Sequence, residues 1–155
     1  MFFFWKNKPP FNNLQESRLF DESSFYKQFI EDLNSSKKEV IIESPYVTSS
    51  RMELLLPVFK KLLSKGIKIY IVTRDPIEHD DNMRDQATNE LLSCHEIGID
   101  IKFLRRNFHR KLALIDKSIL WFGSLNILSQ YKSMEIMERV KDQLIINRLI
   151  NILKY

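Results

Sequence analysis

The hydrophobic positions of this chain recur with two different spacings, and the spacing changes along the chain. Between residues 21 and 35, apolar residues return every three or four positions, which predicts an amphipathic helix. Residues 39–44 instead form a short β-branched run that a proline closes, which predicts a buried strand. The regular part of the chain therefore begins with a helix followed by a strand.

Further helices and strands follow the same two patterns. Ser50 and Glu53 form a capping box for a helix that ends at Gly66, although Pro57 should kink this helix or mark its true beginning. A polar, acidic loop spans residues 74–85. The remaining expected elements are a strand over 67–73, a helix from about 83 to 97, strands over 99–104, 108–115 and 118–122, and a final helix that includes residues 136–149.

The order of these elements predicts the fold class. Strands that alternate with helices indicate an α/β fold, in which a mixed β-sheet is flanked by helices on both faces. The last two strands are joined too tightly for a crossover, so they should form an antiparallel hairpin that turns at Asp116 and Lys117. Residues 1–20 carry two prolines and no clean period, which predicts an irregular N-terminal arm before a single domain over 21–155.

Composition is consistent with one globular core. The chain has 155 residues, of which 44% are hydrophobic and 28% charged. Its apolar runs fall far short of the roughly 20 residues that cross a bilayer, so we expect no stable membrane association. The one cysteine, Cys94, has no partner for an internal disulfide, which favours the reducing cytoplasm.

Positive charge is concentrated in one stretch of the chain. The net charge is only +4, but residues 102–111 contain five basic side chains and no acidic one. Such a stretch attracts a polyanion, so we expect it to bind nucleic acid through Arg105, Arg106 and Arg110. The alternative interpretation is an ordinary solvated loop and strand edge.

Chemically active side chains gather in the same region. His109 and Lys111 are two residues apart on a predicted strand, so both should point to one face. The hairpin then returns the chain to Ser124 and Asn126. A nucleophile or base, a fixed cation, a hydroxyl and an amide are the groups needed to hold a phosphoryl group. A lone histidine in a strand is more often structural, and only the full spacing favours catalysis.

These residues resemble the motifs of a known family. The pattern HxKxxxxD from His109 to Asp116, followed by GSxN at residues 123–126, is similar to the two motifs of the phospholipase D superfamily. The upstream residues 39–74 resemble the first strand, helix and strand of that domain, so the resemblance covers about residues 39–139. The run GSLNILS is also similar to phospholipase D-like domains appended to some bacterial DNA helicases.

The resemblance implies a phospholipase D-like fold and a two-step displacement. His109 would attack phosphorus to give a phosphohistidine, while a second histidine protonates the leaving oxygen and then activates water. Lys111 and Asn126 would bind the non-bridging oxygens, with Ser124 in support. Glu135 would orient and charge the histidine.

The resemblance leaves other points open. Asp116 matches the last motif position but falls in the predicted turn, so a structural role is at least as good an interpretation as a catalytic one. His79 and the aspartates beside it suggest a metal site, but neighbouring residues do not converge on one ion, so we expect neither metal nor cofactor. Because the mechanism needs two histidine and lysine pairs and the chain has one, we expect a homodimer with a shared site.

The function that these points favour is a metal-independent phosphodiesterase that acts as a nuclease on DNA or RNA. A lipid phosphodiesterase or phosphatidyl transferase uses the same chemistry and is one alternative. A catalytically silent nucleic-acid-binding module, which could act as the detached partner of a helicase, is the other.

Overall fold

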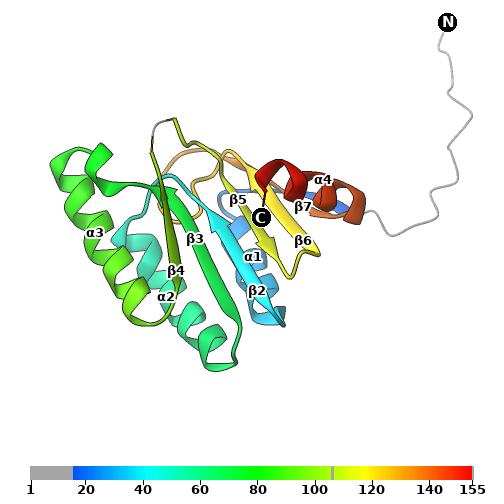
Figure 1. Cartoon of the computed structure of the whole chain (residues 1–155). Coiled ribbons are helices and arrows are strands. Elements are labelled where there is room, and N and C mark those ends of the chain that lie inside the picture. The colour runs from blue at the N-terminus through cyan, green and yellow to red at the C-terminus, as the bar shows by residue number, and fades with distance from the viewer. Residues whose placement is uncertain (1–15, 106, 155) are drawn as a thin grey trace, which may run out of the picture.

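The computed structural model describes residues 16–105 and 107–154, which form a seven-stranded mixed sheet with helices on both faces (Figure 1). The predicted α/β fold class is therefore confirmed. In chain order the elements are β1 (Glu16–Asp21), α1 (Phe25–Ser35), β2 (Glu39–Glu43), α2 (Ser49–Ser64), β3 (Lys68–Arg74), the 3-10 helix η1 (Pro76–Glu78), α3 (Asp81–Glu96), β4 (Asp100–Leu104), β5 (Leu112–Ile115), β6 (Ile119–Gly123), β7 (Ile136–Lys141) and α4 (Gln143–Leu153).

The sheet combines a parallel half with an antiparallel half. Its strand order is β1, β7, β6, β5, β2, β3, β4. Strands β2, β3 and β4 are parallel and are connected through α2 and α3, whereas every other neighbouring pair is antiparallel. The predicted hairpin is formed by β5 and β6, and both residues of its turn, Asp116 and Lys117, have a φ of 52°.

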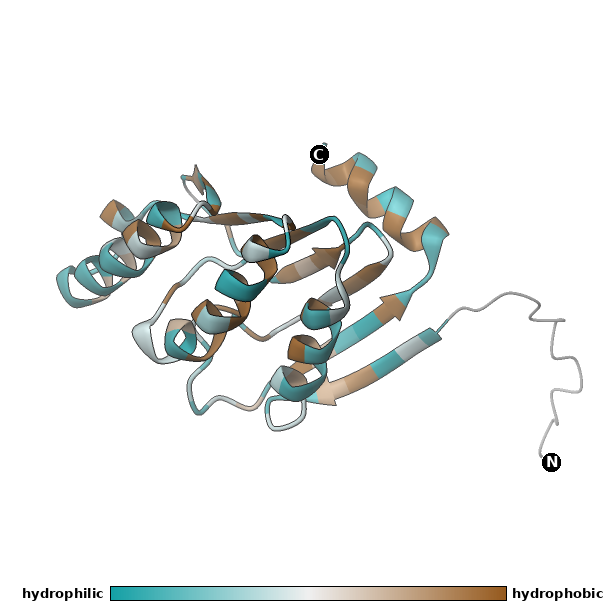
Figure 2. Cartoon of the chain, turned by 90° about the horizontal axis from the view of Figure 1, so that it is seen from below, coloured by the Kyte–Doolittle hydropathy of each residue, from teal (hydrophilic) through white to brown (hydrophobic). Residues whose placement is uncertain are grey.

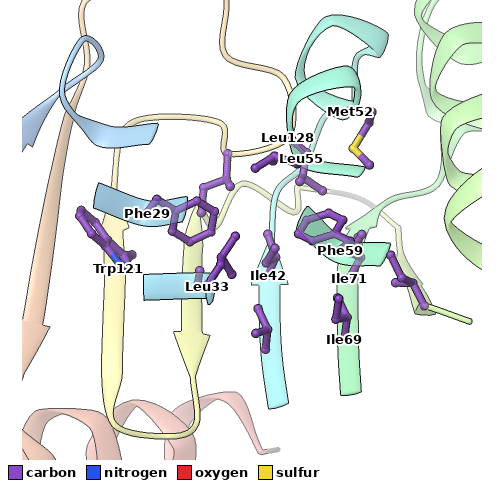
Figure 3. Packing of buried hydrophobic residues seen from close by; sticks show 14 of the residues in the cluster. Phe29, Leu33, Ile42, Met52, Leu55, Phe59, Ile69, Ile71, Trp121 and Leu128 are labelled. Atoms are coloured by element: carbon purple, nitrogen blue, oxygen red, sulfur yellow. The ribbon is translucent and has the colours of Figure 1, made fainter. Parts of the chain in front are cut away.

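The larger hydrophobic core lies between the sheet and helices α1, α2 and α3 (Figure 3). Phe29 of α1 and Phe59 of α2 are fully buried against the sheet, where Ile42 and Trp121 belong to the same cluster. Burial of each such side chain contributes about 1.5–3 kcal/mol. A smaller cluster on the other face includes Ile146 of α4, and Figure 2 shows this helix across the sheet from α1 and α2.

A buried ion pair fixes α1 to the antiparallel half of the sheet. The Asp32 carboxylate accepts hydrogen bonds from Nε and Nη2 of Arg139, at 2.7 and 2.8 Å, and from Nε1 of Trp121 at 2.8 Å. The hydrogen bonds that Arg139 donates to Asp32 raise the pKa of the guanidinium further. Loss of either charged partner would leave the other buried and uncompensated, so this pair holds α1 in one position.

Two strands were not predicted from the sequence. Strand β1 takes in residues 16–20 of the predicted irregular arm together with Asp21, and the Ile136–Lys141 segment, assigned to the final helix, forms its partner β7. Met137 belongs to the core beneath α1–α3, whereas Val140 packs in the cluster beneath α4. Because both faces of β7 are covered, its apolar residues do not alternate cleanly. The rest of the predicted arm, residues 1–15, lies outside the described residues.

Helix boundaries differ from the predicted ones at two N-termini. The N-cap of α2 is Thr48 rather than Ser50, so the predicted capping box is wrong, and Pro57 lies within the helix instead of starting it. Helix α3 starts at Asp81, where the Asp80 side chain accepts a hydrogen bond from the backbone of Met83 at 3.0 Å. The polar stretch before it contains η1 and is partly regular.

Candidate active site

Four strand ends meet at one end of the sheet. The parallel strands β2 and β3 end there at Glu43 and Arg74, β5 starts there at Leu112, and β6 ends there at Gly123. The carboxyl ends of parallel strands are a common place for ligands, because their following loops share one edge. Of the predicted catalytic residues, His109 and Lys111 precede β5, and Ser124 and Asn126 follow β6. Glu135 precedes β7, which starts at the same edge. We call this edge the site end.

The nucleophile predicted from the sequence lies before a strand and not on one. Strand β5 begins at Leu112, so the predicted strand over 108–115 is too long by four residues. His109 is exposed, and Lys111 folds back so that its Nζ donates to the His109 carbonyl oxygen at 2.9 Å. The Lys111 ammonium is therefore held beside His109 by a contact with the His109 backbone and not by strand alternation.

An arginine contacts the ring of this histidine. Nη2 of Arg74, the last residue of β3, lies 3.0 Å from Nε2 of His109 and donates to the Phe108 carbonyl oxygen at 3.2 Å. Sequence analysis had placed Arg74 in a polar loop. Arg74 could have been recognised in the sequence because it directly follows the buried apolar run of β3. The end of this parallel strand lies at the same sheet edge as Glu43.

Two aromatic rings stand behind Arg74. Its Nη1 donates to the Tyr46 hydroxyl at 3.3 Å, and its guanidinium lies 5.2 Å from the centre of the Tyr46 ring. The His79 ring packs against Tyr46 in a tilted arrangement, with 5.0 Å between ring centres and 34° between ring planes. Burial, followed by the charge of Arg74, lowers the pKa of His79, so this ring favours the neutral form. Tyr46 was not predicted to belong to the site, and His79 was predicted to lie in a polar loop.

Ser124 and Asn126 follow the end of β6. The backbone N–H of Ile136 donates to Ser124 Oγ at 3.1 Å, and Ser124 N–H donates to the Ile136 carbonyl at 3.0 Å. Before them, a Cβ on Gly123 would lie only 2.2 Å from the Ile136 carbonyl oxygen, so only glycine fits. Oδ1 of Asn126 is buried and accepts no hydrogen bond from the described residues. Unpaired buried groups of this kind are concentrated where a ligand completes a site.

Glu135 lies at the site end but is directed to other partners. Its carboxylate accepts a hydrogen bond from the Ser133 hydroxyl at 2.7 Å, and its backbone N–H donates to the Glu22 carboxylate at 2.9 Å. No hydrogen bond joins Glu135 to His109 within the part of the chain that the structure describes. The structure therefore does not bring Glu135 and His109 together as the resemblance implies.

Asp116 lies at the opposite end of the hairpin. Its carboxylate accepts three backbone hydrogen bonds, from Lys37 and Lys38 at 2.8 Å each and from Glu39 at 3.0 Å. These contacts hold the connection between α1 and β2 against the turn. Of the two roles left open for Asp116, the geometry fits the structural one, and a catalytic role does not fit this position.

The three predicted substrate-binding arginines have different surroundings. Arg110 forms a two-point ion pair with the fully buried carboxylate of Glu43, with N···O distances of 2.5 and 2.9 Å. Arg105 is largely exposed and pairs with Asp75 at 3.2 Å. Arg106 lies outside the described residues. Arg110 thus compensates a buried charge directly beside the site.

The described residues contain neither a metal-ligand cluster nor a membrane-spanning helix. Within residues 16–105 and 107–154, no group of three histidine, cysteine, aspartate or glutamate side chains gathers as metal ligands would. Asp81 pairs with Arg84 at 2.9 Å and Asp80 caps α3, so the acidic residues beside His79 have separate partners. Over the same residues, no helix is both long and apolar enough to cross a membrane.

The fold and the site agree with a family comparison. A model of the family described as "Cardiolipin synthase, PLD-like domain" matches residues 29–155. The chain therefore belongs to this family of phospholipase D-like domains, as the resemblance of its motifs implied. No curated protein matches the chain.

Solved structures share the fold at low sequence identity. NucT from Helicobacter pylori superposes with a TM-score of 0.67 at 20% identity, over 91% of this chain and 94% of its own. The phospholipase D family member Nuc from Salmonella typhimurium gives 0.70 at 14% identity, over 89% and 91%. Phosphatidylserine synthase from Haemophilus influenzae gives 0.68 at 17% identity, but the match spans only 38% of that chain against 93% of this one.

Proposed function

We propose that this chain is a metal-independent nuclease that hydrolyses phosphodiester bonds of DNA or RNA through a phosphohistidine. The observation that carries the proposal is the convergence of His109, Lys111 and Asn126 at one open end of the sheet. An exposed imidazole supplies the nucleophile, and a fixed ammonium supplies the charge stabilisation that phosphoryl transfer requires. The Asn126 side chain can add a hydrogen bond to a non-bridging oxygen through its Nδ2 donor.

The reaction follows from these groups in two balanced steps. In the first, Nε2 of His109 forms a bond to phosphorus while the bond from phosphorus to the leaving oxygen breaks, and a second, protonated histidine gives that oxygen its proton. In the second, this histidine takes a proton from water, whose oxygen attacks phosphorus and breaks the N–P bond. Histidine thus supplies the nucleophile that many nucleases obtain from metal-bound water.

Three observations support nucleic acid as the substrate. Basic side chains are present around the site end, where Arg105 is exposed and pairs with Asp75, the residue after Arg74, and such charge suits a phosphate backbone. The matched structures NucT and Nuc have lengths close to that of this chain. A further fold match, at a TM-score of 0.60 and 14% identity, is the archaeal chromatin protein TrmBL2, whose structure is described as showing a novel mode of DNA binding.

A second copy of the chain is the proposed source of the second histidine. Beside Ser124 and Glu135, apolar side chains at the site end are exposed, and Met134 is exposed by 91%. The others are Phe122, Tyr131 and Ile136. Exposed apolar patches of this kind mark protein interfaces. Trp121, the residue before Phe122 on β6, is itself fully buried and cannot belong to this exposed patch.

The primary experiment incubates purified protein with labelled single-stranded and duplex DNA and RNA in excess EDTA. Cleavage that survives EDTA supports the proposal. Loss of cleavage on chelation, with recovery on adding magnesium or zinc, contradicts the metal-independent mechanism. Light scattering should give twice the monomer mass of 18.6 kDa.

A matched pair of variants tests the shared site. Met134→Glu places a charge in the proposed interface and should lower both the dimer fraction and the activity. Leu92→Glu makes the same change on the exposed side of α3 and should leave both unchanged. A monomeric Met134→Glu protein with full activity would refute the shared site.

A second candidate is a phosphodiesterase acting on lipids. A groove of about 490 Å³ between α4 and the sheet is lined by apolar residues such as Leu149 and Ile152 and reaches Lys111. An acyl chain would fit such surroundings. Hydrolysis of phosphatidylglycerol in detergent micelles, without cleavage of any nucleic acid, would favour this candidate over a nuclease.

A further inference from the structure

Arg74 makes the most direct contact with the proposed nucleophile. Its Nη2 lies 3.0 Å from Nε2 of His109, the ring nitrogen that attacks phosphorus in the proposed reaction. The same nitrogen donates to the carbonyl oxygen of Phe108 at 3.2 Å, so it contacts both the ring and the backbone next to it. The Arg74 side chain is only 14% exposed, which limits its other contacts with water.

The chemistry of guanidinium fixes the direction of this hydrogen bond. A guanidinium has five N–H donors, no acceptor, and a charge that it keeps at all ordinary pH values. Nε2 of His109 must therefore be the acceptor, which requires a lone pair on Nε2 and a proton on Nδ1. The contact thus selects the neutral tautomer in which the attacking nitrogen is unprotonated.

The same contact blocks attack. The lone pair of Nε2 points at Nη2 of Arg74, so phosphorus reaches Nε2 only after the guanidinium has moved aside. A phosphodiester oxygen carries negative charge and is a stronger acceptor than a neutral imidazole. Exchange of the ring for a phosphate oxygen is therefore favourable for the guanidinium.

The residues around Arg74 keep the guanidinium near this position during such an exchange. Tyr46 accepts a hydrogen bond from Nη1 at 3.3 Å, its ring centre lies 5.2 Å from the guanidinium carbon, and the His79 ring packs against Tyr46. The Nε of Arg74 is buried and donates to no acceptor among the described residues, and the Glu78 carboxylate lies 4.0 Å from it. Tyr46 thus holds the guanidinium through Nη1, while Nη2 faces His109.

The neighbouring cations have contacts of their own. Arg110 is bound at two points to Glu43, and Lys111 donates to the backbone carbonyl of His109 and not to its ring. Arg74 differs from these two described cations in that its Nη2 lies within hydrogen-bond distance of Nε2 of His109, while Nη1 contacts Tyr46.

We propose that Arg74 is a phosphate-binding residue that caps Nε2 of His109 in the unliganded protein and exchanges this contact for a non-bridging phosphate oxygen when substrate binds. The exchange uncovers the lone pair at the moment the phosphate is in place. This proposal deepens the proposed function and rests on it for the identity of the substrate.

The tautomer can be measured on the full-length wild-type protein without substrate. In long-range ¹H–¹⁵N spectra of protein labelled in histidine, the His109 ring should show a protonated Nδ1 and an unprotonated Nε2. Absence of its signals from the His109→Asn spectrum identifies them among those of His79 and His95. A wild-type ring with its proton on Nε2 would overturn the proposal.

A variant and a probe test the exchange. Arg74→Met keeps an unbranched stem over Tyr46 but removes the donors, so the His109 ring should shift toward the tautomer protonated on Nε2. Inorganic phosphate should perturb the His109 Nε2 signal in the wild type and bind Arg74→Met about tenfold or more weakly, the size expected for a lost charge-assisted hydrogen bond. Arg18→Met, on the exposed edge strand β1, is the matched control and should match the wild type in both measurements.

The outcomes separate this proposal from the proposed function. If Arg74→Met retains the wild-type tautomer and phosphate affinity, Arg74 is structural and the proposal fails, whatever the enzyme cleaves. If tautomer and phosphate affinity change as expected while neither DNA nor RNA is cleaved by the wild type, the nuclease assignment fails and the role of Arg74 in binding phosphate stands.

Discussion

The two ends of the β5–β6 hairpin carry residues of one sequence motif, and they differ in how their polar groups are paired. At the turn, the Asp116 carboxylate accepts three backbone hydrogen bonds. At the site end, His109 is exposed, its ring contacts Arg74, and the buried Oδ1 of Asn126 accepts no hydrogen bond from the described residues.

This difference separates stability from chemistry within one motif. A carboxylate that is saturated by backbone donors has nothing left with which to bind substrate, and it stabilises the chain connection that it holds. Polar groups that are exposed or unpaired cost stability and are available to a ligand. The hairpin of four- and five-residue strands thus joins a structural end to a reactive one.

The largest effect is expected from His109. His109→Asn should lower kcat/KM for nucleic-acid cleavage by at least about 10⁴-fold, because the nucleophile is lost, and should leave the melting temperature unchanged. His95→Asn, the same substitution on α3, should retain full activity. Near wild-type cleavage by His109→Asn would show that His109 is not the nucleophile.

Lys111 should give the next largest effect. Lys111→Met removes a cation from the developing negative charge and should lower kcat/KM by about 10²–10³-fold. Lys117→Met makes the same change at the turn end of the hairpin, where the ammonium pairs with Glu39 at 3.3 Å, and should leave kcat/KM unchanged. Equal losses in the two variants would contradict the difference between the ends.

Substitution of Asp116 should lower stability and spare activity, which is the reverse of the effect expected at His109. Asp116→Ala leaves three backbone donors without their acceptor and should lower the free energy of unfolding by about 2 kcal/mol, measured by urea denaturation. Activity per folded molecule should stay within about twofold of the wild type. Asp116→Asn keeps one acceptor oxygen and tolerates the positive φ of this turn, so its loss of stability should be smaller. An Asp116→Ala protein that is as stable as the wild type but inactive would show that Asp116 has a catalytic role.

The sequence predicted most of the fold because most elements have local signals. The α2 helix, the parallel strands and the hairpin turn carry apolar periods or tight connections that are visible without tertiary context. Strand β1 and its partner β7 were missed because their pairing joins residues more than a hundred positions apart. Neither strand has a clear local signal, because both faces of β7 are covered and β1 is an edge strand whose side chains are mostly exposed.

The sequence predicted those residues of the candidate site that are close together along the chain, and it missed those that only the fold brings there. The motif residues lie within one short stretch, so their spacing identifies them. Arg74 and Tyr46 reach the site from β3 and from the loop after β2, and only the parallel register of those strands places them there. The contact between Lys111 and the His109 carbonyl likewise depends on the backbone leaving strand geometry before Leu112, which propensity does not indicate.

The smallest expected effect concerns the pH dependence of stability at the site end. Burial, followed by the charge of Arg74, lowers the pKa of His79 below its usual 6.5, so the folded protein binds fewer protons than the unfolded chain at slightly acidic pH. Stability should therefore fall as the pH drops from 6.5 through the folded-state pKa, and should recover as the pH rises.

Urea unfolding between about pH 5 and 7.5 should show that the free energy of unfolding depends less steeply on pH for His79→Gln than for the wild type. His95→Gln, on the surface of α3, is the control and should keep the wild-type slope. Identical slopes for wild type and His79→Gln would mean that the ring packed on Tyr46 accepts a proton as readily as it does in the unfolded chain.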